Sequence, residues 1–179
     1  MAKKVTVIST SIRPNSNSEL LAKSFAEGAE AAGNEVVFIT LKDKDIRFCR
    51  GCLFCHQTGK CIIQDDVAPI MDAVLQADVV AWATPIYYFE MSGQMKTLID
   101  RMNPMYPKDY RFRDVYFLAT AADEGDDVFE KAETGLTGWL ECFPKTTLKG
   151  TVYCGGVTGG GAISGNAKLA EARALGVQA

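Results

Sequence analysis

Short apolar runs alternate with stretches of helical spacing along the chain, and this alternation limits the possible folds more than any other feature. The runs, rich in Val and Ile, occupy residues 5–8, 36–39, 79–83, 115–119 and 152–153. Their continuous apolar character suits strands that are buried on both faces of a sheet. Five such runs separated by helices predict parallel strands joined by right-handed crossovers. We therefore expect a doubly wound α/β fold, with a five-stranded parallel sheet and helices on both faces.

The segments between the runs carry apolar residues three or four positions apart, as one face of a helix requires. Five such faces are expected. They consist of Leu21, Phe25, Ala29 and Ala32; Val67, Met71, Val74 and Leu75; Met95, Leu98, Ile99 and Met102; Val128, Ala132, Leu136, Leu140 and Phe143; and Ile163, Ala167, Ala170 and Ala174.

Length and charge narrow the classes of function. The 179 residues suit a single domain, so we expect one unit over residues 1–179. Hydrophobic residues make up 47% and charged residues 23%, which is ordinary for a globular chain. The net charge is -3, and Lys42 and Lys44 alternate with Asp43 and Asp45. Because no basic stripe is available to neutralise a phosphate backbone, we expect no nucleic-acid partner.

The apolar runs are also too short for export or membrane insertion. None approaches the roughly 20 residues of a spanning helix, and the first run is too short for a secretory signal. We expect a cytoplasmic protein without a membrane partner. In that compartment, the six cysteines should bind metal, carry out redox chemistry or be buried, rather than form structural disulfides.

The loop after the first run, residues 9–18, is rich in hydroxyl groups. It contains four serines, one threonine and Arg13, and no acidic residue. Hydroxyls and N–H groups at a helix N-terminus suit a phosphate dianion. The alternative is that Ser16, Asn17 and Ser18 only cap the following helix. Because both glycine-rich nucleotide motifs are missing, a monophosphate fits this loop better than a dinucleotide.

Three consecutive aromatic residues, Tyr87, Tyr88 and Phe89, follow the third run. At the carboxyl edge of a sheet they offer a platform for a flat ring, and Pro85 stiffens the turn before them. The alternative is that they only cover the end of the core. Ligands of doubly wound folds bind beyond the carboxyl ends of the strands, so the loops after the first, third and fourth runs are expected to share one site.

Together these loops resemble the NADPH-dependent FMN reductase and flavodoxin-like family over most of the chain. Two positions depart from the family pattern, since Thr10 replaces its usual glycine and Ile12 its usual proline. The residues that match the family pattern are Ser16, Asn17, Ser18, Pro85, Ile86, Tyr87, Ser92, Lys96, Asp100 and Arg101.

The resemblance implies a flavodoxin-like fold that binds FMN. The first loop would hold the phosphate, and the loops after the third and fourth runs would contact the isoalloxazine. The implied cofactor-binding residues are Ser9, Ser11, Ile12, Arg13, Ser16, Asn17, Ser18, Pro85, Ile86, Tyr87, Tyr88, Phe89, Thr120 and Ala121.

A cysteine-rich loop at residues 47–65 follows the second run. Cys49, Cys52, Cys55 and Cys61 lie within thirteen residues, so four thiolates can converge on one centre. Their spacing resembles that of iron-sulfur flavoproteins, which implies a four-iron four-sulfur cluster. Zinc prefers two separated pairs, which favours the cluster. A zinc site, a Cys52–Cys55 redox pair and free thiols remain as alternatives.

The remaining candidates are weaker. His56 is the single histidine, which excludes multi-histidine metal sites, and we expect it on the surface of the cysteine-rich loop. Asp66 should cap a helix that begins at Val67. Cys142 and Cys154 have apolar neighbours and are expected to be buried. Glycines at 155–156 and 159–161 should form turns that can approach a neighbouring subunit's cofactor.

The resemblance implies an FMN-dependent oxidoreductase. NAD(P)H would be the co-substrate, and a flavin, quinone or similar small molecule or protein would be the acceptor. We predict no catalytic side chain, because the cofactor carries the chemistry. The alternative is an iron-sulfur flavoprotein that carries electrons to a ferredoxin-like partner, and a third hypothesis is a zinc-binding interaction module. A homodimer or homotetramer is expected.

Overall fold

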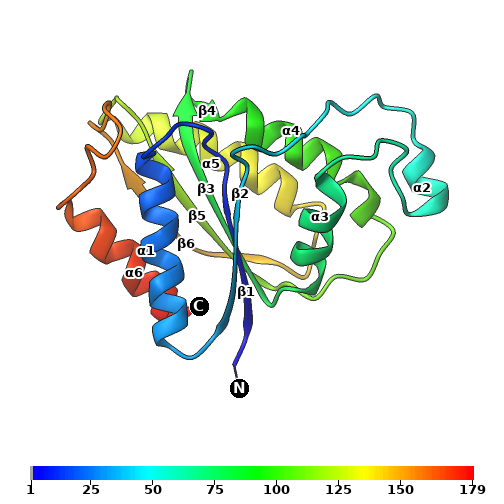
Figure 1. Cartoon of the computed structure of the whole chain (residues 1–179), viewed down its shortest axis with the longest axis horizontal. Coiled ribbons are helices and arrows are strands. Elements are labelled where there is room, and N and C mark those ends of the chain that lie inside the picture. The colour runs from blue at the N-terminus through cyan, green and yellow to red at the C-terminus, as the bar shows by residue number, and fades with distance from the viewer. Residues whose placement is uncertain (1) are drawn as a thin grey trace.

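The computed structural model describes residues 2–179, apart from the side chain of residue 126. Its core is a parallel sheet in the order β2-β1-β3-β5-β6, which confirms the predicted doubly wound fold (Figure 1). A short strand that the sequence did not predict, β4, pairs antiparallel with β3. The strands are β1 (Lys4–Ser9), β2 (Glu35–Thr40), β3 (Val79–Tyr87), β4 (Glu90–Met91), β5 (Asp114–Thr120) and β6 (Thr147–Cys154).

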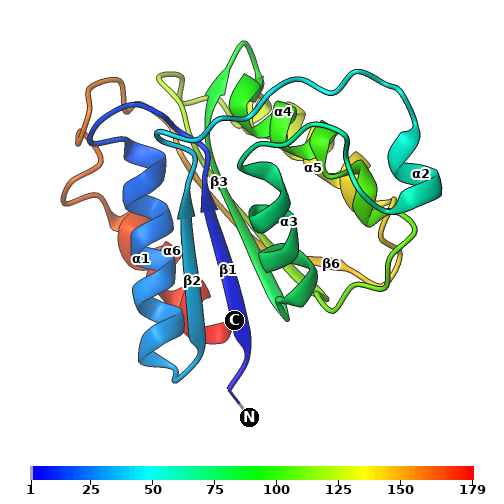
Figure 2. The same ribbon diagram turned by 45° about the vertical axis from the view of Figure 1, so that its right-hand side comes forward.

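Helices cover both faces of the sheet, and each face has its own apolar core. One face is covered by α1 (Asn17–Ala31) and α6 (Ala167–Gln178), the other by α3 (Val67–Gln76), α4 (Gly93–Arg101) and α5 (Asp126–Leu140) (Figures 1 and 2). Two short helices, α2 (Phe54–Thr58) and η1 (Asn103–Met105), lie beside each other outside these layers. Among the described helices, none is both long and apolar enough to cross a membrane.

The contact between α1 and α6 corrects one predicted helix face. Ala167, Ala170 and Ala174 are exposed, whereas Ala172 and Gly176 are buried against α1. The reason is a very close approach of the two helices. A Cβ atom added at Gly176 would overlap the backbone of Phe25 in α1. The buried face is therefore defined by the smallest residues, which a search for apolar periodicity does not detect.

Buried hydroxyl groups join the ends of β1 and β3 to the start of α4. The Thr10 hydroxyl donates to the carbonyl of Ala83 at 3.0 Å and lies 3.2 Å from the Ser92 hydroxyl. Ser92 caps α4 by accepting from the Met95 N–H, and Thr84 donates to the same Ser92 oxygen. Thr10, which stands where a glycine was expected, therefore fixes the carboxyl edge of the sheet.

Candidate functional site

A cleft of about 200 Å³ opens at the carboxyl edge of the sheet, where the loops after β1, β5 and β6 meet the end of β3. The sequence does not predict three of the lining residues, Ala122, Val157 and Thr158. Nine lining residues are among those the sequence predicts, namely Ser11, Arg13, Ser16, Asn17, Pro85, Ile86, Tyr87, Thr120 and Ala121.

The N-terminus of α1 contributes buried hydroxyl groups to the cleft. Ser16 occupies the N-cap position, but in the described part of the chain its hydroxyl makes no capping bond. It instead lies 3.1 Å from the hydroxyl of Ser18, and both serines are buried. Capping alone therefore does not explain Ser16. A helix N-terminus whose N–H groups are not capped by a side chain is suited to bind an anion.

Asn17 connects the first loop to the loop after β6. Its side-chain amide donates to the carbonyls of Val157 and Gly159 at 3.2 and 2.9 Å, and its side-chain oxygen accepts from the Ile163 N–H. Arg13 donates to the Thr158 carbonyl at 2.7 Å. These bonds bring Val157 and Thr158 to the cleft.

Two glycines of the loop after β6, Gly160 and Gly161, pack against this chain's own first loop. A Cβ atom at Gly160 would lie 3.3 Å from the carbonyl oxygens of Pro14 and Asn15. This contact is tight, because few Cβ atoms in proteins approach a neighbour so closely. Gly160 and Gly161 thus have a packing role inside one subunit.

Five predicted residues lie outside the lining of the cleft. Ser9 is fully buried, and its hydroxyl has no hydrogen-bond partner among the described residues. Ser18 is also fully buried. Ile12 is 54% exposed and lines a separate groove. Tyr88 and Phe89 form the turn between β3 and β4.

That turn holds aromatic residues in a backbone conformation that favours glycine. Tyr88 and Phe89 have φ values of 51° and 65°, where a Cβ atom is strained. Tyr88 is 100% exposed. The ring of Phe89 lies 4.0 Å from Lys131 Nζ, over α5. Of the three consecutive aromatics, Tyr87 is therefore the one at the cleft.

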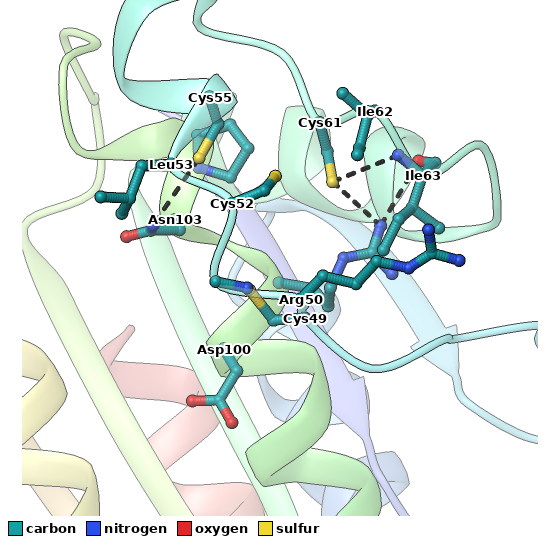
Figure 3. A pocket seen from close by; sticks show the side chains of 13 residues that line it. Cys49, Arg50, Cys52, Leu53, Cys55, Cys61, Ile62, Ile63, Asp100 and Asn103 are labelled. Atoms are coloured by element: carbon teal, nitrogen blue, oxygen red, sulfur yellow. Dashed lines mark hydrogen bonds between the residues drawn. The ribbon is translucent and has the colours of Figure 1, made fainter.

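The four cysteines of the cysteine-rich loop line one pocket, which lies against the end of α4 (Figure 3). The pocket has a volume of about 20 Å³, enough for about one water molecule. All six cysteines are free thiols. Within residues 2–179, no three His, Cys, Asp or Glu side chains are placed to hold one metal ion. The loop therefore brings the four thiols together but does not arrange them as a finished metal site.

Three of the four sulfurs accept hydrogen bonds. Cys49 and Cys61 accept from the backbone N–H groups two residues later, at 3.4 and 3.5 Å. Cys55 accepts from the side-chain amide of Asn103 at 3.6 Å (Figure 3). Hydrogen bonds to sulfur are typical of cluster ligands, since they stabilise the negative charge. The donor chemistry fits a cluster, but the loop would have to widen to hold one.

A buried ion pair lies beside this pocket. Arg101 and Asp65 are 1% and 0% exposed, and their charged atoms approach to 2.6 Å. Burial opposes the charge of Asp65, but hydrogen bonds from Arg101 and from the N–H groups of Arg47 and Val67 outweigh it and lower the pKa of the carboxyl. The pair therefore stays charged in the interior.

Three smaller expectations can be compared with the structure. Asp66 precedes α3, but its carboxylate accepts from the Asp45 N–H, and it is Asp65 that accepts from the Val67 N–H. Asp66 therefore occupies the predicted N-cap position, but its side chain makes no capping bond among the described residues. Cys154 is buried as predicted, whereas Cys142 is exposed because the chain leaves α5 just before it. His56 is exposed, as expected.

Comparison with known proteins adds a family match and several relatives. The family described as "NADPH-dependent FMN reductase" matches residues 3–147. The iron-sulfur flavoprotein MJ1083 of Methanocaldococcus jannaschii is 39% identical over 102 residues, which are 57% of this chain and 53% of that protein. The chain thus spans about half the length of this relative. The putative NAD(P)H-dependent FMN-containing oxidoreductase YwqN of Bacillus subtilis is 32% identical over 112 residues, 62% of this chain and 58% of that protein.

A solved structure supports the fold. The NAD(P)H:quinone oxidoreductase from Methanothermobacter marburgensis superposes with a TM-score of 0.73, covering 99% of this chain and 97% of that protein. The sequences are only 16% identical. At that level the similarity concerns the fold alone.

Proposed function

The chain belongs to the NADPH-dependent FMN reductase family, and from this premise we propose that it is an FMN-dependent oxidoreductase that takes electrons from NAD(P)H. Family membership confirms the resemblance that the sequence indicates. The observation that carries the proposal is the cleft at the carboxyl edge, where an N-terminus of α1 rich in hydroxyl groups faces Pro85, Ile86 and Tyr87 at the end of β3. One end suits a phosphate and the other suits a flat ring.

The residues of the cleft fit FMN by their chemistry. Ser11, Ser16 and the first N–H groups of α1 would hold the phosphate, with the positive charge of Arg13 nearby. Pro85 and Tyr87 would lie beside the ring. When bound, FMN supplies the hydride acceptance and electron transfer, while the protein supplies position and electrostatics.

The volume of the cleft helps to indicate which kind of electron acceptor could reach the flavin. Its volume of about 200 Å³ is below the range of about 300–1,000 Å³ that is usual for small-molecule pockets. Part of the flavin would therefore remain accessible from outside. This supports a flavin, a quinone or a protein as the acceptor.

The test is an FMN titration followed by NAD(P)H oxidation with free flavin or quinone. We expect S11A and S16A each to weaken FMN binding, S16A by about tenfold, because a hydrogen bond to a charged group contributes roughly 1.5 kcal/mol or more. The matched control is S164A, since Ser164 is exposed and outside the cleft. Unchanged affinity in both variants would refute the phosphate site, and absence of NAD(P)H oxidation would refute the reductase activity.

A second function, electron transfer through an iron-sulfur cluster, is favoured by the cysteine-rich loop. Its four sulfurs line one pocket, and the relative from M. jannaschii is named an iron-sulfur flavoprotein. Cys49, Cys52, Cys55 and Cys61 would hold a four-iron four-sulfur cluster, and the partner would be a ferredoxin-like protein. Anaerobic purification with iron and sulfide analysis decides the matter, because stoichiometric zinc or metal-free protein would contradict the cluster.

The proposal also covers the assembly and its location. It takes residues 1–179 as one FMN-binding unit that forms a homodimer or homotetramer in the cytoplasm. Free thiols suit a reducing compartment. Light scattering of the FMN-loaded protein measures the subunit number, and a monomer at micromolar concentration would contradict the oligomer.

A further inference from the structure

We propose that Arg101 and Asn103 are positioning residues for the cysteine-rich loop: they hold the sulfurs of Cys61 and Cys55, and the pair of Arg101 with Asp65 shapes the loop before any cluster binds. The part that concerns the cluster rests on the proposed electron-transfer function. The part that concerns the shape of the loop does not.

The guanidinium of Arg101 connects the two ends of the loop. It binds Asp65 with two hydrogen bonds, of 2.6 and 3.0 Å. It also donates to the carbonyl of Arg47 at 2.6 Å and to that of Ile63 at 3.4 Å. Arg47 precedes the first cysteine of the loop and Ile63 follows the last. One buried side chain on α4 thus fixes where the loop begins and ends.

Asp65 extends this connection to α3. Its carboxylate accepts from the N–H of Arg47 at 3.0 Å and from that of Val67 at 3.2 Å. Removal of either charge would leave the other buried and unpaired, which is strongly unfavourable. Both partners are therefore needed for the observed course of the loop.

Two residues near the end of α4 also touch the sulfurs. Arg101 donates to Cys61 at 3.5 Å, and Asn103 donates to Cys55 at 3.6 Å (Figure 3). The Nε atom of Arg101 is buried without a hydrogen-bond partner among the described residues. Arg101 lines the pocket of the four cysteines, so this spare donor favours a further acceptor there, such as a cluster sulfur.

These contacts have a redox consequence. Reduction adds negative charge to a cluster, and hydrogen bonds to its sulfurs together with a nearby positive charge stabilise that charge. Arg101 and Asn103 should therefore make the midpoint potential less negative. A residue that only supported the fold would leave the potential unchanged.

The first experiment measures the loop without a cluster. Hydrogen exchange of FMN-loaded, iron-free protein is compared in wild type, R101Q, D65N and the control K96Q. The control breaks the exposed Lys96–Asp100 pair on the same helix and leaves Arg101 and Asp65 in place. We expect the amides of Arg47 and Val67 to exchange at least about tenfold faster in R101Q and D65N, and at the wild-type rate in K96Q. Wild-type exchange in R101Q and D65N overturns the role in shaping the loop.

The second experiment measures the potential after anaerobic reconstitution with iron and sulfide. R101K keeps the charge, and N103A removes a single donor, so both remain informative if R101Q does not fold. We expect a more negative midpoint potential in N103A and R101Q, and a smaller shift in R101K. Unchanged potentials overturn the role toward the sulfurs. If wild type binds no iron or sulfide, the cluster proposal and the role toward its sulfurs fall together, and hydrogen exchange alone decides the loop-shaping role.

Discussion

At the scale of single residues, the turn of Tyr88 and Phe89 carries backbone strain. Both residues have positive φ, and turns of this kind usually contain Asn-Gly. Strained backbone often accompanies function, because it persists only where the surrounding structure imposes it. The exposed Tyr88 next to the cleft residue Tyr87 is consistent with such a role.

We expect the double substitution Y88N/F89G to stabilise the fold. Removing the side chains that strain the left-handed backbone should raise the free energy of unfolding by about 1–2 kcal/mol per residue. The loss of the Phe89–Lys131 contact should lower it by about 0.5–1 kcal/mol. Urea unfolding should then show a net gain of at least about 1 kcal/mol. The control Y88F keeps the backbone strain and should show no gain. A loss of stability in the double variant would contradict the strain argument.

Asp78 gives a pH dependence at the same scale. Partial burial opposes its charge, but the Lys4 N–H and the Arg111 guanidinium outweigh burial and lower its pKa below the ordinary 3.8. A carboxyl whose pKa is lowered by folding stabilises the fold at pH values above its pKa in the unfolded state. This stabilisation is lost as the pH falls through the pKa of the folded state. We expect D78N to lose about 1–2 kcal/mol at pH 7 and to respond less than wild type to acid below about pH 4. D109N, at a side chain that is 91% exposed, is the control. Equal acid sensitivity of D78N and wild type would count against the assignment.

At the scale of elements, the contact of α1 with α6 depends on glycine. A Cβ atom at Gly28 would overlap the carbonyl of Arg173, and one at Gly176 would overlap that of Phe25. Both clashes are with backbone, so a side-chain movement cannot relieve them. The helices must separate if either glycine is replaced.

We expect G28A and G176A each to destabilise the fold by about 1–3 kcal/mol or more, as overpacking does. The matched control is G138A in α5, because an added Cβ there has no atom within 4 Å among the described residues. Alanine favours a helix over glycine, so G138A should gain up to about 1 kcal/mol. Thermal unfolding of the three variants measures the difference, and equal stability of G28A and G138A would refute the close contact.

The sequence pattern predicted the elements that are buried through apolar side chains. It missed the contacts that are made by buried polar side chains or by close packing of backbone. β1, β2, β3 and β5 have apolar residues on both faces, so their positions and the parallel sheet followed from the pattern, whereas β6 was recognised only at residues 152–153. The face of α6 did not, because Gly176 packs by backbone. Arg101 was placed by resemblance but without a role, since charged residues are rarely buried and only the fold brings Asp65 to it. The loop after β6 reaches the cleft through Asn17, a long-range contact without a local signal.

At the scale of the whole molecule, α4 connects the two candidate redox sites. Its cap, Ser92, contacts Thr10 of the first loop, and its last residue, Arg101, anchors the cysteine-rich loop. The nine residues of α4, which end with Arg101, correspond to about 13 Å of helix. The two sites thus share a rigid support but no side chain, so their binding energies should be separable.

FMN should therefore stabilise the whole fold without help from the cysteine-rich loop. A ligand that binds only the folded state, at 100 times its dissociation constant, adds about 2.7 kcal/mol to the free energy of unfolding. We expect FMN to add this amount to the free energy of unfolding of wild type. D65N should be less stable without FMN but should gain the same amount, because Asp65 does not line the cleft. At the same FMN concentration, S16A should gain about 1.4 kcal/mol, since tenfold weaker binding removes the rest. Chemical denaturation with and without FMN measures these gains. A reduced gain in D65N would show that the two sites are coupled, and no gain in wild type would show that the folded chain does not bind FMN.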